Sequence, residues 1–192
     1  MTRRIRVNDV PTPPPLTDEL REQARRSPGK WFYAIDPFFD PGGEVPPYGI
    51  IGAWQADERG EISGEFRHNP NYRPSPVALD YPDPTDPLDD AIQLSSTGYA
   101  TGEGIVALLL EADVIVAAGP DGGIPVFDTD EGRTALVCTA QAHLPGEFPE
   151  GSTGWQRIRG GDLIGLLPAG VGVAINPFGP VGVVLPHTDL RR

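Results

Sequence analysis

The side chains in this chain best suited to catalysis or zinc binding are three histidines and one cysteine. His68, His143 and His187 are far apart, and none has another His, Cys or carboxylate at the spacing of a metal site. Cys138 stands in an apolar run, where a cysteine is more often a small core residue than a nucleophile. The sequence therefore predicts no catalytic residue, no metal and no cofactor, and we expect a protein that is not an enzyme.

Aspartates form the strongest cluster of one residue type, at Asp80, Asp83, Asp86, Asp89 and Asp90. A divalent cation needs several oxygen ligands that converge on one loop. Here prolines and the start of a helix separate the carboxylates, and such a pattern is more typical of helix caps and solvated turns. We therefore interpret these residues as structural.

A group of aromatic residues is the best candidate for binding a partner. Phe38 and Phe39 are adjacent in a Pro- and Gly-rich loop, where two neighbouring rings cannot easily both point inward. Tyr48, Tyr72 and Arg73 belong to this region and to the next Pro-rich segment. Exposed aromatic residues and Arg are favoured at the centres of protein interfaces. We predict that these five residues bind a protein partner; the alternative is that their loops only cover the sheet and shield its edge.

The first half of the chain must position these aromatic residues. Residues 1–30 are expected to form an arm and a short helix, with Thr17 as the N-cap, acidic residues in the first turn and arginines in the last. Residues 31–85 form a Pro- and Gly-rich front segment. Its apolar runs predict strands over 31–35 and 48–54, and a weaker strand over 62–67.

Residues 86–192 alternate between helical and strand patterns. Asp86 followed by proline predicts a helix to about Thr97, and a second helical stretch starts at Thr101. Strands are expected over 114–117, 124–127 and 135–139.

A further helix is expected between Asp162 as its cap and Pro168 as its end. It carries four large aliphatic residues in five positions, too many for one amphipathic stripe, so we expect it to be mostly buried. These residues are Leu163, Ile164, Leu166 and Leu167. A buried strand then ends at an Asn176-Pro177 turn.

The composition is that of a folded protein. The 192 residues, 39% of them hydrophobic, suffice for one domain with a substantial core. The net charge of −12 opposes nucleic-acid binding, because that affinity comes mostly from Lys and Arg. We find no signal-peptide pattern and no apolar run of the roughly 18 residues that a membrane helix needs. We expect 31–85 and 86–192 to form one cytoplasmic α+β domain. It would have an antiparallel or mixed sheet with helices on one side and the Pro-rich front segment wrapped over it.

The segment from about residue 86 to 186 resembles the N-terminal domain of the SseB family, small soluble proteins often found beside bacterial secretion genes. The resemblance lies in the order of the elements, in the turn and strand over 129–139, and in the tail Gly170-Val171-Gly172-Val173-Ala174-Ile175-Asn176-Pro177. Over 138–140 the chain has Cys-Thr-Ala, whereas members commonly have an aromatic residue followed by Thr-Ser. The front segment, residues 31–76, resembles an extension of actinobacterial proteins that are associated with type VII secretion.

These resemblances imply a non-enzymatic accessory protein of a bacterial secretion system, an adaptor or chaperone-like factor, with type VII as the expected system. Its partners would be proteins, either secretion components or secreted substrates, with neither nucleic acid nor membrane insertion involved. The alternatives are a small-ligand or regulatory binding domain and, less favoured, an unrecognised hydrolase. The oligomeric state stays open.

Two segments of the chain repeat each other. Residues 33–38 and 173–178 both contain Ala-Ile, then Asp or Asn, then Pro-Phe. They fit equivalent strands of a duplicated unit, and they equally fit chance in a chain with 24 Gly and 23 Pro.

Overall fold

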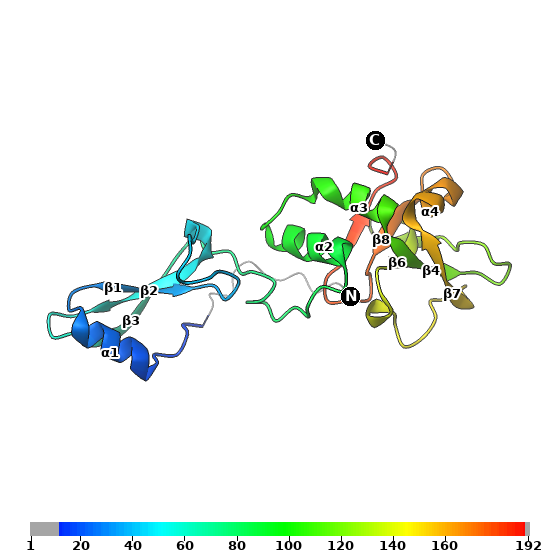
Figure 1. Ribbon diagram of the computed structural model, residues 1–192. Helices are drawn as coiled ribbons and strands as arrows, with labels where there is room; N and C mark the ends of the chain where they lie inside the picture. The colour runs from blue at the N-terminus through cyan, green and yellow to red at the C-terminus, as the bar shows by residue number, and fades with distance from the viewer. Residues whose placement is uncertain (1–11, 191–192) are drawn as a thin grey trace. The chain divides into compact units, whose positions relative to one another are not determined.

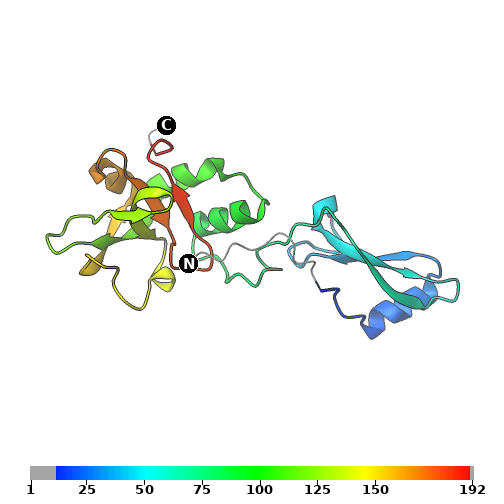
Figure 2. The same ribbon diagram turned by 180° about the vertical axis from the view of Figure 1, so that it is seen from behind.

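The computed structural model describes residues 12–190, which divide between Asp80 and Tyr81 into two compact units (Figures 1 and 2). We call them the N-terminal unit and the C-terminal unit. Most of the predicted arm lies outside the described residues. The expectation that 31–85 and 86–192 form one domain stays a prediction.

The N-terminal unit consists of one helix and a three-stranded antiparallel sheet in the order β1-β2-β3 (Figure 1). Its elements are α1 (Asp18–Arg26), β1 (Trp31–Ile35), the short 3-10 helix η1 (Pro47–Gly49), β2 (Ile50–Ala56) and β3 (Ile62–His68). The strands follow the apolar runs of the sequence. All three predicted strands are therefore present, with β2 starting two residues later because η1 precedes it.

Helix α1 packs on the sheet of the N-terminal unit. The side chain of Thr17 caps it, as predicted, by accepting a hydrogen bond from the Leu20 N–H at 3.2 Å. The turn before β3 touches the end of the helix so closely that a Cβ atom on Gly60 would come within 2.6 Å of the Arg25 Cα atom. Gly60 also has φ +79°, so both the close contact with the helix and the backbone conformation require glycine at this position. The small core comprises Ala34, Ile51 and Trp54, against which Leu16, Leu20, Ile62, Phe66 and Tyr72 pack.

The C-terminal unit contains a mixed sheet in the order β7-β4-β6-β8-β9, with β5 paired to β6. Strands β6 and β8 are parallel, and the other pairs are antiparallel. The elements are α2 (Pro87–Thr97), η2 (Gly102–Gly104), α3 (Ile105–Glu111), β4 (Asp113–Ala118), β5 (Phe127–Thr129), β6 (Gly132–Cys138), η3 (Gln141–His143), β7 (Gly154–Arg159), α4 (Gly160–Leu166), β8 (Gly172–Ile175) and β9 (Val183–Leu185).

The core of this unit lies between one face of the sheet and the helices. Alternate strand residues point to the same face. The strand side of the core comprises Val114, Val116, Ala135, Val137, Val173 and Ile175, and the helix side includes Leu88, Ile92, Ile105, Leu109 and Leu163. The helices therefore cover one face, and the predicted α+β class with antiparallel and mixed strands is confirmed.

Several boundaries in the C-terminal unit differ from the sequence prediction. Strand β5 begins at Phe127 and not at residue 124, because Pro125 has no N–H for the ladder. Helix α4 starts at Gly160, so Asp162 is in its first turn and is not its cap. The Gly160 N–H bonds to the Ala112 carbonyl oxygen, and a Cβ atom there would collide with the Leu109 carbonyl oxygen. Contact with α3 thus sets the start of this helix. Strands β7 and β9 were not predicted.

The expectation that α4 is mostly buried is wrong for one of its leucines. Leu163 is fully buried and Leu167 is 7% exposed, whereas Leu166 is 65% exposed. Helix α4 is only seven residues long. Its face toward the core buries Leu163, whereas Leu166, three residues later at the end of the helix, is in solvent.

We expect Leu163→Ala to lower the free energy of unfolding by roughly 2–5 kcal/mol, because it leaves a cavity in the core. Leu166→Ala is the matched control, and we expect it to change stability by about 0.5 kcal/mol or less, as is usual for surface substitutions. Urea denaturation followed by circular dichroism measures both. Equal losses from the two variants would contradict this placement of α4.

None of the helices in the described part of the chain combines the length and the hydrophobicity that crossing a bilayer requires.

Candidate functional site

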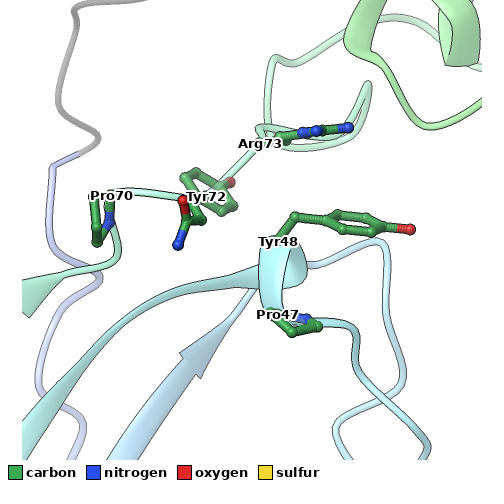
Figure 3. Close-up of a pocket in the computed structure, with 6 residues that line it drawn as sticks. Pro47, Tyr48, Pro70, Tyr72 and Arg73 are labelled. Carbon is green, nitrogen blue, oxygen red and sulfur yellow. The ribbon is translucent and has the colours of Figure 1, made fainter.

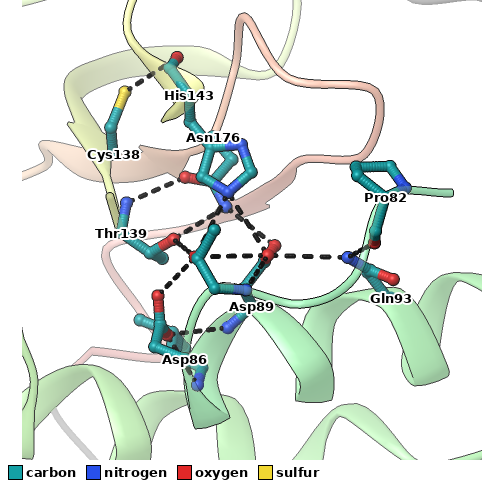
Figure 4. Close-up of polar contacts among 10 residues, drawn as sticks. Pro82, Asp86, Asp89, Gln93, Cys138, Thr139, His143 and Asn176 are labelled. Carbon is teal, nitrogen blue, oxygen red and sulfur yellow. Dashed lines mark hydrogen bonds and ion pairs between the residues drawn. The ribbon is translucent and has the colours of Figure 1, made fainter. Parts of the chain in front are cut away.

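The C-terminal unit contains a group of polar side chains that we call the Asp89 cluster. Asp89, Thr139, His143 and Asn176 are buried (Figure 4), and the exposed Thr85 completes the cluster. Asp89, His143 and Asn176 are 1%, 5% and 0% exposed. They come from the first turn of α2, from η3 and from the residue after β8. The sheet and α2 therefore bring together residues that are 54 and 87 positions apart in the chain.

The Asp89 carboxylate is the centre of this cluster. One oxygen, Oδ2, accepts a hydrogen bond from the Thr85 N–H at 3.0 Å and lies 3.2 Å from His143 Nε2. The other oxygen accepts from Asn176 Nδ2 at 3.2 Å. Asn176 Oδ1 in turn accepts from the Thr139 N–H at 2.9 Å. The cluster thus connects the start of α2 to the ends of β6 and β8.

A histidine beside a carboxylate and near a cysteine resembles the parts of a nucleophilic site, but the cysteine is not activated. The Cys138 thiol donates to the backbone carbonyl oxygen of His143 at 3.4 Å, not to the imidazole. Burial raises the pKa of this thiol to about 12, so it is protonated at neutral pH. Within residues 12–190, no group of His, Cys, Asp and Glu is placed to hold a metal ion. We interpret the cluster as a structural connection between helix and sheet.

The sequence pattern does not indicate this cluster. It predicts that His143 is isolated and that Asp89 is one of several capping or solvated carboxylates. Asp86 is indeed the N-cap of α2, with Oδ1 accepting from the Leu88 and Asp89 N–H groups. The spacing within α2 could have indicated the cluster. Asp89 and Gln93 are four residues apart and directly follow the apolar residues Leu88 and Ile92, so the helix pattern could have predicted that Asp89 and Gln93 are buried.

The five predicted partner-binding residues all lie in the N-terminal unit, and the structure brings them close together. The rings of Phe38 and Phe39 are 5.4 Å apart, and Phe39 is 6.2 Å from Tyr48. The Arg73 guanidinium lies 5.6 Å above the Tyr48 ring, as Figure 3 shows. Tyr72 is next to Arg73 and donates its hydroxyl to Asp36 at 2.7 Å. We call these five residues the aromatic surface.

An open hollow adjoins the aromatic surface (Figure 3). It is lined by Pro47, Tyr48, Pro70, Asn71, Tyr72 and Arg73. Phe38 is 45% exposed, Tyr48 and Tyr72 are half-buried and Arg73 is exposed. Phe39 is half-buried, because its ring packs against Gly49 where a Cβ atom would collide with it. Their role in binding stays a prediction.

Asp36 fixes the loops that carry the aromatic surface. It is fully buried, and its carboxylate accepts hydrogen bonds from the Phe38 N–H at 2.9 Å, the Tyr72 hydroxyl, and the N–H and hydroxyl of Ser75. One side chain thus ties the Phe38 turn to the Pro-rich segment that follows β3. No local pattern around Asp36 indicates this role.

The two repeated segments also form similar turns. Asp36 and Asn176 each follow the last residue of a strand, and both are fully buried. In each turn the backbone carbonyl oxygen accepts from the N–H three residues later at 3.0 Å, and the following phenylalanine, Phe38 or Phe178, is 45% or 43% exposed. The turns differ in that only Asn176 has a positive φ, 51°. Both a duplication and chance still account for the repeat.

Comparison with known proteins gives one match. The model of the SseB protein N-terminal domain matches residues 88–192, which include the whole mixed sheet, its helices and most of the Asp89 cluster. No curated protein and no solved structure matches the chain. The family match covers more than half of the chain and coincides with the C-terminal unit, so the chain belongs to the SseB family.

Proposed function

We propose that this protein is a non-enzymatic cytoplasmic accessory protein of a bacterial secretion system, an adaptor or chaperone-like factor that acts through protein–protein contacts. Its membership of the SseB family supports the link to secretion. The resemblance of residues 31–76 to type VII-associated proteins makes type VII the system we favour.

The observation that carries the proposal is the aromatic surface of the N-terminal unit. Its residues come from two segments that Asp36 holds together, so little side-chain and loop entropy would be lost on binding. Aromatic residues and Arg are the types that contribute most to interface energies. Phe38 is the side chain best placed to enter a pocket on a partner, because it is exposed on a fixed turn.

The shape of the hollow beside Tyr48 favours protein contact over a small ligand. Small-molecule sites are concave and bury about 70–90% of the ligand surface. The hollow at Tyr48, Tyr72 and Arg73 is open to solvent, with polar and apolar atoms in similar proportion. A flat or convex partner surface therefore fits it better than an enclosed molecule.

The test is capture of a partner from the native host, identification by mass spectrometry, and titration of the purified pair. We expect Phe38→Ser to weaken binding by about tenfold or more, which corresponds to about 1.4 kcal/mol. Phe178→Ser is the matched control, because Phe178 is similarly exposed in a similar turn of the C-terminal unit. We choose Phe38 alone, since removing Phe39 would also remove its packing against Gly49.

The melting temperature of each variant separates binding from folding. A Phe38→Ser protein that melts like the wild type and no longer binds would support the proposal. A variant that still binds with wild-type affinity would contradict it. A variant that melts much earlier would favour the alternative, in which the loops only cover the sheet.

A further inference from the structure

The outer edge of β1 has no strand partner among residues 12–190. In the order β1-β2-β3, one side of β1 pairs with β2, and no other described strand pairs with it. The Lys30 carbonyl oxygen and the Asp36 N–H both bond toward β2 and η1, at 2.9 Å each. Since backbone groups alternate in direction along a strand, Trp31, Tyr33 and Ile35 direct their N–H and C=O groups outward.

The other sheet edges carry features that discourage pairing, and β1 does not. Strand β3 contains Gly64 at φ +79° as well as charged residues. Strand β7 contains Arg157 and Arg159, and β5 and β9 have only three residues each. Charges, irregular backbone, proline and shortness are the usual means by which proteins protect an edge. Strand β1 has five uncharged residues and no proline.

We propose that β1 pairs antiparallel with β1 of a second copy of this chain, with Tyr33 on the two-fold axis. This inference goes beyond the proposed function, because it concerns self-association and needs no secretion partner. In this register Trp31 lies opposite Ile35 of the second copy, and Phe32 lies opposite its Ala34. Each outward-facing residue then meets another outward-facing residue, so both backbone hydrogen bonds of every such pair can form.

The side chains suit this register. Tyr33 is 61% exposed, and on the axis it would lie directly opposite its own copy, where aromatic pairs stabilise a sheet. Lys30 would lie across from Asp36 of the second copy, whose carboxylate is buried in its own turn, so no like charges face each other. Residues 1–80 carry 10 of the 15 Lys and Arg and 12 of the 27 Asp and Glu, so the net charge of −12 belongs mostly to the C-terminal unit. The symmetry of the pattern about Tyr33 is what favours a second copy over an unrelated strand.

Analytical ultracentrifugation of the full chain over a range of concentrations tests the proposal. We expect the wild type to shift from monomer toward dimer as its concentration rises. Tyr33→Lys should remain monomeric, because it places two like charges on the axis. The control is Gln55→Lys, which adds the same charge at an exposed position of the central strand β2, and it should dimerise like the wild type. A wild type that stays monomeric up to about 1 mM, or a dimer that survives Tyr33→Lys, overturns the proposal.

Cross-linking tests the register without relying on charge. Residues of a hydrogen-bonded antiparallel pair have Cα atoms about 5.5 Å apart, within the roughly 4.4–6.8 Å range of disulfides. Mild oxidation of Tyr33→Cys should give a covalent dimer, whereas Gln55→Cys and the wild type, whose Cys138 is buried, should not. If Tyr33→Cys stays monomeric on oxidation, the register is wrong.

A synthetic peptide of residues 29–37 presents the same strand as a second copy of β1. It should occupy the β1 edge and lower the dimer fraction of the wild type, and a dimer that is unchanged by excess peptide would contradict pairing through β1. These measurements use no secretion partner, so their outcome is independent of the Phe38 experiment.

Discussion

Replacing Asp89 by alanine is expected to lower the free energy of unfolding of the C-terminal unit by roughly 3–5 kcal/mol, because each buried donor left unsatisfied costs roughly 1–3 kcal/mol. The substitution would leave the Thr85 N–H, His143 Nε2 and Asn176 Nδ2 without the oxygen atoms that they now face. Water cannot replace these oxygens easily, because Asp89, His143 and Asn176 are nearly inaccessible.

The adjacent Asp90 provides a matched control. Both aspartates are in the first turn of α2 and have the same favourable interaction with the helix dipole, but Asp90 is exposed. Asp90→Ala should therefore cost about 1 kcal/mol or less. Hydrogen exchange of the β6 and β8 amides measures the loss within this unit alone. Similar losses for Asp89→Ala and Asp90→Ala would show that the cluster contributes little.

Elements with strong local signals could be predicted from the sequence. Thr17 and Asp86 are the N-caps of α1 and α2, and the run Trp31–Ile35 is β1 without change of bounds. In these cases the deciding interactions lie within a few residues of each other. The SseB resemblance likewise located the C-terminal unit, because the order of its elements is visible in the pattern.

Boundaries that depend on contacts between elements could not be predicted. Helix α4 starts where Gly160 meets α3, and no local cap marks that residue. The exposure of Leu166 follows from the same packing. The four aliphatic residues predicted a buried helix, but the sequence does not show how short the contact between α4 and the rest of the unit is.

The polar clusters were missed for a related reason. Asp89, His143 and Asn176 meet only because α2, η3 and β8 adopt their places around one sheet. Each of them has an ordinary local interpretation: a first-turn acid, an isolated histidine and a turn asparagine. By contrast, the aromatic surface was predicted as a set, because its residues lie in two neighbouring loop segments.

Asp36→Ala is the second substitution for which we expect a large effect, this time in the N-terminal unit. It removes the acceptor of the Phe38 N–H, the Tyr72 hydroxyl and both donors of Ser75. Each buried donor left unsatisfied costs roughly 1–3 kcal/mol, so we expect a loss of about 3–5 kcal/mol in this unit. This loss should be a large share of the free energy of unfolding of the unit, because the core around Trp54 is small.

Graded variants separate the acceptor from the shape of the side chain. Asp36→Asn keeps the shape but turns one acceptor into a donor, so we expect a smaller loss than for alanine. Asp40→Ala is the control, because Asp40 is exposed and its carboxylate accepts only the Gly42 N–H among the described contacts. Quenching of tryptophan fluorescence reports mostly on this unit, since two of the three tryptophans, Trp31 and Trp54, belong to it and Trp54 is 4% exposed. If Asp36 fixes the aromatic surface, Asp36→Asn should also weaken partner binding with Phe38 intact, whereas unchanged affinity would show that the loops hold their shape without it.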